Sequence, residues 1–131
     1  MAAIRGKDTK PEMIVRRWLW KRGFRYRLNS PKLPGHPDLV LRKYRTCVFV
    51  NGCFWHRCPR CNLPLPKSNV EYWVVKFDRN VERDERNLAH LREAGWKVHV
   101  IWECQLKKNE IDQTFAELLP VLAEELGKEL K

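Results

Sequence analysis

The stretch DLVLRKYRTCVFV, residues 38–50, decides the fold. Two runs of apolar and β-branched residues, DLVLR and TCVFV, stand on either side of the polar link KYR. Such short runs are typical of strands that are buried in the middle of a sheet. The stretch therefore predicts a hairpin of two central strands.

Helical and extended patterns surround this hairpin. Residues 11–22 begin with Pro and Glu and carry apolar residues at helical spacing, and residues 69–94 repeat such a pattern over a longer range. FRYRL (24–28) predicts a short strand, and WKVHVIWEC (96–104) predicts a strongly β-branched one. Pro120 interrupts the helical tail, so we expect two short helices or one kinked helix there.

The order helix, three strands, helix, strand, helix predicts an α/β sandwich around a small mixed sheet. A chain of 131 residues that is 44% hydrophobic can build one core, so we expect one domain over residues 1–131. Because no apolar run is long enough for a membrane span or a signal peptide, we also expect a soluble, intracellular protein.

The net charge of +10 is placed asymmetrically. Residues 1–51 hold 13 Lys and Arg against 3 acidic residues, and residues 52–131 hold 13 of each. A basic excess of this kind favours a nucleic acid partner, since neutralised phosphates release condensed counterions. The alternative is a basic surface that only keeps the protein soluble.

Cysteine spacing suggests a metal site. Cys47 lies in an apolar run and is interpreted as a core residue, which leaves Cys53, Cys58, Cys61 and Cys104. The CPRC pair offers the two-residue spacing of a zinc knuckle, and four thiolates would close a structural site. A redox dithiol and inert thiols are alternatives, and His56 is a competing ligand.

Three residues suggest a nuclease centre. Asp38 follows a proline at the start of a strand, where a carboxylate can hold Mg²⁺ together with water and phosphate oxygens. His56 is suited to take a proton from an attacking water, and Glu12 adds a second carboxylate. Asp38 and Glu12 also have structural alternatives: a turn-forming Asp before a strand, and a Glu that interacts with the helix dipole.

Adjacent aromatic residues suggest contacts with bases. Phe54 and Trp55 are consecutive between two prospective metal ligands, and Trp73 opens the long helical segment. Rings presented by a rigid loop can stack on bases or wedge between them, although they can also fill a core around the metal. Three other tryptophans are assigned to the core: Trp18, Trp96 and Trp102.

Four segments together resemble the very-short-patch-repair (Vsr) mismatch endonucleases: IRGKDTKPE, LPGHPDLVL, VNGCFWHRC and NVERDERNLAHLREAGWKVHVIWEC. The likeness covers about residues 1–108. It implies a three-layer sandwich like that of type II restriction endonucleases, with a structural zinc site. It also implies a nick 5′ to the thymine of a T:G mismatch, the product of 5-methylcytosine deamination.

The resemblance assigns roles to residues of this chain. Asp38 and the backbone carbonyl of Val50 match a Mg²⁺ site, His56 matches the residue that activates water, and Glu12 matches a supporting glutamate. The intercalating aromatics of the family match Phe54, Trp55 and Trp73. Zinc ligands of the family match Cys53, Cys58 and Cys104.

The chain also departs from the family pattern. Asn51 replaces a second active-site histidine, Cys58 replaces a histidine ligand, and Cys61 is displaced by one residue from the usual third position. Met1 and Ile4 match residues of an arm that inserts into the duplex, but the arm is short here.

The resulting prediction is a monomeric, bacterial, cytoplasmic enzyme at the nucleoid. It would use catalytic Mg²⁺ and structural Zn²⁺, with mismatched double-stranded DNA and possible mismatch-repair proteins as partners. One alternative is a catalytically silent, zinc-containing DNA-binding module. Another is a restriction-type enzyme that cuts both strands of a paired site.

Overall fold

The structure is a computed structural model that describes residues 9–28, 30–61 and 63–129, with only the helical backbone for residues 123–129. Its elements in chain order are α1 (Lys10–Lys21), β1 (Arg27–Leu28), β2 (Leu39–Leu41), the 3₁₀ turn η1 (Arg42–Tyr44), β3 (Thr46–Asn51), α2 (Val70–Glu93), β4 (Lys97–Trp102), the 3₁₀ turn η2 (Glu103–Leu106) and α3 (Ile111–Glu129). None of the helices in these ranges has the length and apolar character needed to cross a bilayer.

The four strands form one mixed sheet in the order β1-β2-β3-β4. The first three strands pair antiparallel, and β3 pairs with β4 in parallel. A parallel pair requires a crossover connection, and α2 supplies it. The predicted hairpin of central strands is therefore confirmed.

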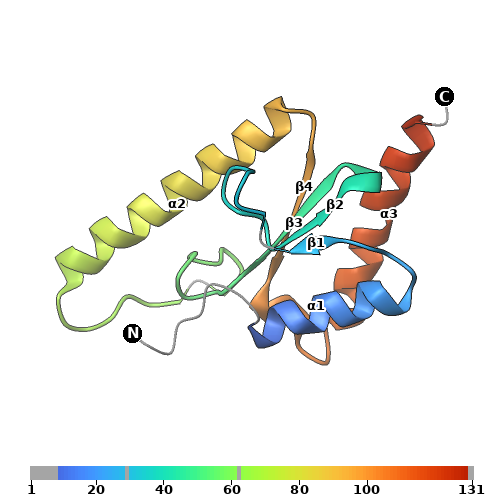
Figure 1. The fold of residues 1–131 in the computed structure, drawn as a ribbon. Helices are drawn as coiled ribbons and strands as arrows, with labels where there is room; N and C mark the ends of the chain where they lie inside the picture. The colour runs from blue at the N-terminus through green and yellow to red at the C-terminus, as the bar shows by residue number, and fades with distance from the viewer. Residues whose placement is uncertain (1–8, 29, 62, 130–131) are drawn as a thin grey trace.

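Helices cover both faces of the sheet (Figure 1). On one face, Leu39, Leu41 and Val48 pack against residues of α1 and α3. On the other face, Val40, Cys47 and Phe49 pack with Leu91 of α2. Because alternate side chains of a strand point to opposite faces, the continuous apolar runs fill two cores.

The predicted α/β three-layer sandwich is thus confirmed, with two differences in detail. The strand predicted over FRYRL is shorter in the structure and covers only Arg27–Leu28, whose two side chains are both exposed at the sheet edge. The tail forms one helix with Pro120 inside it, which is the single-helix form of the two that were expected, because Phe115 and Leu122 on either side of Pro120 pack into the same core. The three tryptophans assigned to the core are only partly buried and pack around its margins: Trp18, Trp96 and Trp102.

The strand directions gather chain segments at one end of the sheet. β2 begins beside Asp38, and its antiparallel partner β3 ends at Asn51. The parallel strand β4 ends at the same side with Trp102 opposite Asn51. Gly35 closes this end, where its φ of +77° is unfavourable for other residues and a Cβ would lie 3.0 Å from that of Asn87.

Candidate active site and cysteine cluster

A pocket of about 610 Å³ opens at this end of the sheet. Its lining includes three residues predicted from the sequence to be catalytic, Glu12, Asp38 and His56, together with Val50 and Asn51. Glu12 comes from α1, and Asp38 directly precedes β2. Val50 and Asn51 are the last residues of β3, and His56 lies in the loop that follows. Strand pairing, rather than proximity in the sequence, brings them together.

Two carboxyl groups meet in the pocket. Glu12 is 2% exposed and forms an ion pair with Arg16 at 3.6 Å, while Thr9 caps the helix by accepting from the Glu12 N–H. Asp38 Oδ2 accepts from the Val50 N–H at 2.7 Å. Burial, with the nearby Glu12 carboxyl, raises the pKa of Asp38 to about 7, against the lowering effect of the Val50 N–H and of His56.

This electrostatic arrangement suits a cation. Two buried carboxyl groups repel one another when both are ionised, and a bound divalent ion removes that repulsion. Carboxylate and carbonyl oxygens are the donors that hard divalent cations prefer. The oxygens of Asp38, Glu12 and Val50 therefore fit such an ion.

His56 is held by a carboxylate on α2. Its Nδ1 lies 2.5 Å from Asp84 Oδ2, and the two side chains are 30% and 26% exposed. With its proton on Nδ1, the ring donates to Asp84 and leaves Nε2 as an acceptor. This pairing is the arrangement by which a carboxylate orients a histidine base.

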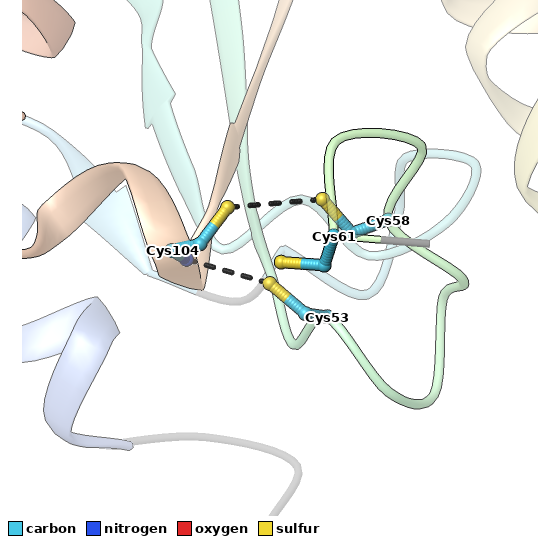
Figure 2. Close-up of side chains that lie close together, drawn as sticks. All are labelled: Cys53, Cys58, Cys61 and Cys104. Carbon is cyan, nitrogen blue, oxygen red and sulfur yellow. Dashed lines mark hydrogen bonds between the residues drawn. The ribbon is translucent and has the colours of Figure 1, made fainter. Parts of the chain in front are cut away.

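The four candidate metal ligands also converge. The sulfur atoms of Cys53, Cys58, Cys61 and Cys104 all lie within 4.8 Å of one another, and Figure 2 shows them facing a common centre. The Sγ atoms of Cys58 and Cys104 are 3.8 Å apart, close to the roughly 3.8 Å expected for a tetrahedral site with metal–sulfur bonds of about 2.3 Å. The cluster can therefore hold a metal, and His56 is not part of it.

Burial and neighbouring groups shift the pKa values of the thiols in this cluster. Burial raises the pKa of Cys53 and that of Cys104 above the ordinary value. Burial also opposes ionisation of Cys58, but N–H donors from the backbone of Cys61 and Arg60 lower the pKa of that thiol below its ordinary value. A metal would favour the thiolate form of all four residues.

The predicted aromatic residues form a cluster beside the pocket. Phe54 packs edge-on against Trp55 with ring centroids 5.0 Å apart, and Trp55 lies 5.8 Å from Trp73. Phe77 completes the group with a stacked contact to Trp73 at 5.4 Å. Since Phe54, Trp55 and Trp73 are half-buried, each ring is supported on one side and accessible on another.

Comparisons with known proteins show the family of the chain. Residues 1–62 match the family model described as DNA mismatch endonuclease Vsr. The DNA mismatch endonuclease Vsr of Escherichia coli strain K12 is 39% identical over 110 residues, which cover 84% of this chain and 70% of that protein. The chain belongs to the Vsr family of DNA mismatch endonucleases.

Other matches extend the comparison. The type II nicking enzyme V.NmeAIP of Neisseria meningitidis is 48% identical over 113 residues, covering 85% of this chain and 79% of the enzyme. The catalytic domain of the homing endonuclease I-Bth0305I has a TM-score of 0.63 over 90% of this chain and 98% of that domain, at 21% identity. This Vsr family member is a DNA endonuclease with a nuclease fold.

The structure brings most of the predicted site residues of this Vsr protein together. The pocket collects the candidate catalytic residues. The loop after β3 carries Phe54 and Trp55 of the aromatic cluster and three of the four cysteines, while Trp73 lies on α2 and Cys104 lies in η2. Asn51, in place of a second histidine, also lines the pocket. Met1 and Ile4, the predicted inserting residues, lie outside the described residues.

Three residues that position the loop were missed in the sequence. Asp84 holds His56, and Asn80 donates to the Trp55 carbonyl at 3.3 Å. Arg57 adopts a positive φ of 54° and donates to the carbonyls of Phe54 and Leu63. A signal existed for two of them, because Asn80 and Asp84 share a helix face with Phe77 at helical spacing.

The raised pKa of Asp38 predicts an unusual dependence of stability on pH. Between about pH 4 and pH 7 the folded state binds more protons than the unfolded state, so without Mg²⁺ stability should fall as pH rises through this range. Asp38→Asn should remove this fall and raise the melting temperature by several degrees above pH 7. The melting temperatures of wild type and Asp38→Asn, measured by thermal unfolding between pH 5 and pH 8 without chelator, test this prediction.

Asp78→Asn is the matched control, because it removes an exposed carboxylate of α2. It should keep the pH dependence of the wild type. Equal pH dependence in wild type and Asp38→Asn would contradict the electrostatic account of the pocket.

Proposed function

We propose that this protein is a Mg²⁺-dependent nicking enzyme that cuts one strand 5′ to the thymine of a T:G mismatch. The observation that carries the proposal is the convergence of Asp38, Glu12 and His56 in one pocket beside an aromatic cluster. Family membership supports mismatched DNA as the substrate, and the relatives named nicking enzymes support cleavage of one strand.

Asp38 and the main-chain carbonyl of Val50 would hold Mg²⁺ in this proposal, with Glu12 close by. When bound, the ion neutralises charge on the scissile phosphate and favours departure of the leaving oxygen. Asp38 must be ionised to bind a cation. Because the pKa of Asp38 is about 7 without a cation, cation binding should release a proton near neutral pH.

His56 takes a proton from the attacking water through Nε2. The Asp84 carboxylate fixes the ring orientation through Nδ1 and stabilises the imidazolium that forms. Asn51, which can donate and accept, lines the same pocket and would contact a phosphate oxygen. The proton therefore moves from the water to Nε2 of His56, whose ring is oriented by Asp84.

The aromatic cluster provides mismatch selectivity. Phe54, Trp55 and Trp73 wedge beside the mismatched pair, and stacking on their rings offsets the loss of base stacking. A mismatched step costs less to unstack than a paired step, by an amount on the order of a few kcal/mol. The same rings therefore bind the T:G duplex better than the paired duplex.

The metal of the cysteine cluster is zinc in this proposal. Four thiolates at tetrahedral spacing are the usual donor set of structural zinc, which has no open position for substrate. The Cys104 N–H donates to Cys53 Sγ at 3.4 Å, and Arg60 donates to Cys104 Sγ at 3.5 Å, so the sulfurs also have outer partners.

The nicking proposal predicts a specific product pattern. A duplex with one T:G mismatch should be nicked in the thymine strand when Mg²⁺ is present, and the paired duplex should be cut at least about 100-fold more slowly, as expected for a few kcal/mol of discrimination. Asp38→Ala should abolish nicking and retain duplex binding, because it removes a metal ligand and no base contact. Denaturing gels measure nicking, and fluorescence anisotropy measures duplex binding.

Two outcomes distinguish the alternatives. A wild-type protein that binds the mismatch without cutting it under all Mg²⁺ concentrations would indicate a silent binding module. Linear product from a circular plasmid without mismatches would indicate a restriction-type enzyme.

The His56–Asp84 pair predicts non-additive kinetics. Asp84→Asn should lower the single-turnover rate at saturating DNA by about 100-fold or more, because the histidine loses its orientation. Combined with His56→Ala, it should add almost nothing, since the two residues act as a unit. Glu85→Gln, an exposed neighbour on α2, should leave the rate unchanged. Additive losses in the double variant would refute the pairing.

The zinc assignment predicts about one zinc ion per chain by elemental analysis. Cys58→Ser should lose the ion and lower the melting temperature by several degrees, because the loop loses its cross-link. Cys47→Ala should keep the ion, since the Cys47 thiol lies in the sheet core and its pKa is raised to about 12 by burial. Retention of zinc by Cys58→Ser, or its absence from wild type, would count against the site.

A further inference from the structure

The Arg57 side chain is part of the aromatic cluster. Its Cζ lies 4.4 Å from the centre of the Phe77 ring and 5.7 Å from that of the Phe54 ring. Phe54 packs edge-on against Phe77 with ring centroids 5.2 Å apart, and Phe77 is only 3% exposed. A guanidinium over a ring face is attracted by the π electrons, more strongly where water is excluded. Arg57, itself half-buried, is therefore packed against the rings instead of being a solvated surface charge.

The same guanidinium joins two segments of the loop that follows β3. Nη1 of Arg57 donates to the Phe54 carbonyl at 3.3 Å, and Nη2 donates to the Leu63 carbonyl. Phe54 precedes the CPRC turn and Leu63 follows it, so the segments on both sides of the turn bond to one side chain. A planar fork of N–H donors can serve two carbonyls at once, and a lysine ammonium lacks that geometry.

The backbone at Arg57 does not favour a residue with a side chain. Its φ of 54° lies in the left-handed region, which glycine adopts freely and other residues adopt at a cost. The turn around it is closed by the His56 N–H, which donates to the Gly52 carbonyl at 3.2 Å, and by the Cys58 N–H, which donates to the Cys53 carbonyl at 2.9 Å. Glycine would therefore keep this turn, and the guanidinium is what arginine adds to it.

The residues next to Arg57 are held by other partners. Asp84 orients the His56 ring through Nδ1, and Cys58 belongs to the cysteine cluster. The Phe54 carbonyl, in contrast, bonds to the Arg57 guanidinium. Removal of the guanidinium should therefore release Phe54 and leave His56 in place.

We propose that Arg57 is the positioning residue that holds the Phe54 ring for insertion at the mismatch, an inference that rests on the proposed function. A ring that wedges between bases binds better when its orientation is fixed beforehand, because less conformational freedom is lost on binding. The guanidinium supplies this order through the Phe54 carbonyl and through Phe77, against which the Phe54 ring packs. Arg57 thereby acts on DNA through Phe54 and needs no contact with a base.

The effect of Arg57 should fall on mismatch selectivity. Insertion of a ring costs less at a mismatched step, so it contributes most to the T:G complex. A paired duplex that resists insertion is held chiefly through its phosphates, and those contacts do not depend on Phe54. Loss of the guanidinium should therefore weaken the T:G complex more than the paired complex and lower the ratio of the two affinities.

Arg57→Gly in the full chain tests the proposal. Duplex binding is measured by fluorescence anisotropy without Mg²⁺, and nicking is measured by single-turnover kinetics at saturating T:G duplex with Mg²⁺. The T:G to paired affinity ratio should fall about 10-fold, as expected for loss of a charged hydrogen bond and a cation–π contact. Because His56 and Asp84 are untouched, the rate at saturation should stay within about threefold of wild type, so affinity and rate separate.

Arg57→Lys separates positioning from charge. Lysine keeps the positive charge and can lie over Phe77, but it cannot serve two carbonyls with a planar fork. The affinity ratio should therefore stay at least about threefold below that of wild type, as expected for one lost hydrogen bond. A wild-type ratio in Arg57→Lys would show that charge alone matters and would overturn the proposal.

Phe77→Leu removes the ring that the guanidinium covers and keeps an apolar side chain. It should also lower the affinity ratio, because the Phe54 ring loses the surface against which it packs. Combined with Arg57→Gly, it should add less than its own effect, since both changes act on the same ring.

Arg45→Gly is the matched control. Arg45 also has a left-handed φ of 53°, its Cζ lies 4.5 Å from the centre of the Trp96 ring, and it donates to the Ala94 carbonyl at 3.3 Å. It directly precedes β3, at the end of the sheet opposite to the pocket. Arg45→Gly therefore removes the same charge and the same kinds of contact, and its affinity ratio should equal that of wild type.

An affinity ratio in Arg57→Gly that equals that of wild type, or an equal fall in Arg45→Gly, would overturn the proposal. Equal losses of affinity and of rate at saturation would also overturn it, because they would indicate a displaced His56. If Arg57→Gly loses its metal or unfolds, Arg57→Lys and Phe77→Leu decide, and a wild-type ratio in either would overturn the proposal. A wild type that prefers the T:G duplex but never nicks it would refute the proposed function alone.

Discussion

The parallel pairing of β3 with β4 is the constraint on which the rest of the structure depends. Its register places Asn51 opposite Trp102, so two segments about fifty positions apart leave the sheet side by side. One continues into the loop that carries His56, and the other carries Cys104. A parallel pair also forces a long crossover, and that crossover is α2. The loop is therefore enclosed by the cysteine cluster and by α2.

The cysteine cluster and α2 hold different parts of the loop that follows β3. The cysteines fix its base, where Cys53, Cys58 and Cys61 meet Cys104. Asn80 and Asp84 of α2 fix its tip through the Trp55 carbonyl and the His56 ring. Residues with no regular secondary structure thereby gain a defined geometry. A histidine base needs such support because small displacements from the reacting atoms cost much of the rate.

The pocket is electrostatically unfavourable until a charge of opposite sign is present. Asp38 and Glu12 are both carboxylic acids in a buried place, and the raised pKa of Asp38 is the consequence. Charge on the surface of α2 is organised in the opposite sense, because Lys76, Arg79 and Arg83 lie on one face of this helix. Residues 52–131 hold equal numbers of basic and acidic residues, so this organisation depends on helical spacing rather than on a net excess.

The sequence by itself determined the local helices and strands and which residues are candidates for metal binding and catalysis. The prediction of a helix over 69–94 differs from α2 by one residue at each end, because apolar periodicity and flanking turn residues are local signals. The four cysteines and the pair Asp38 and His56 were identified by residue type and spacing. Only the tertiary structure decided that His56 pairs with Asp84, that it stays outside the cysteine cluster, and that Pro120 lies inside one helix. Those outcomes depend on which distant segments pack against one another. A sequence pattern indicates which residues are buried, but it does not indicate which residues they contact.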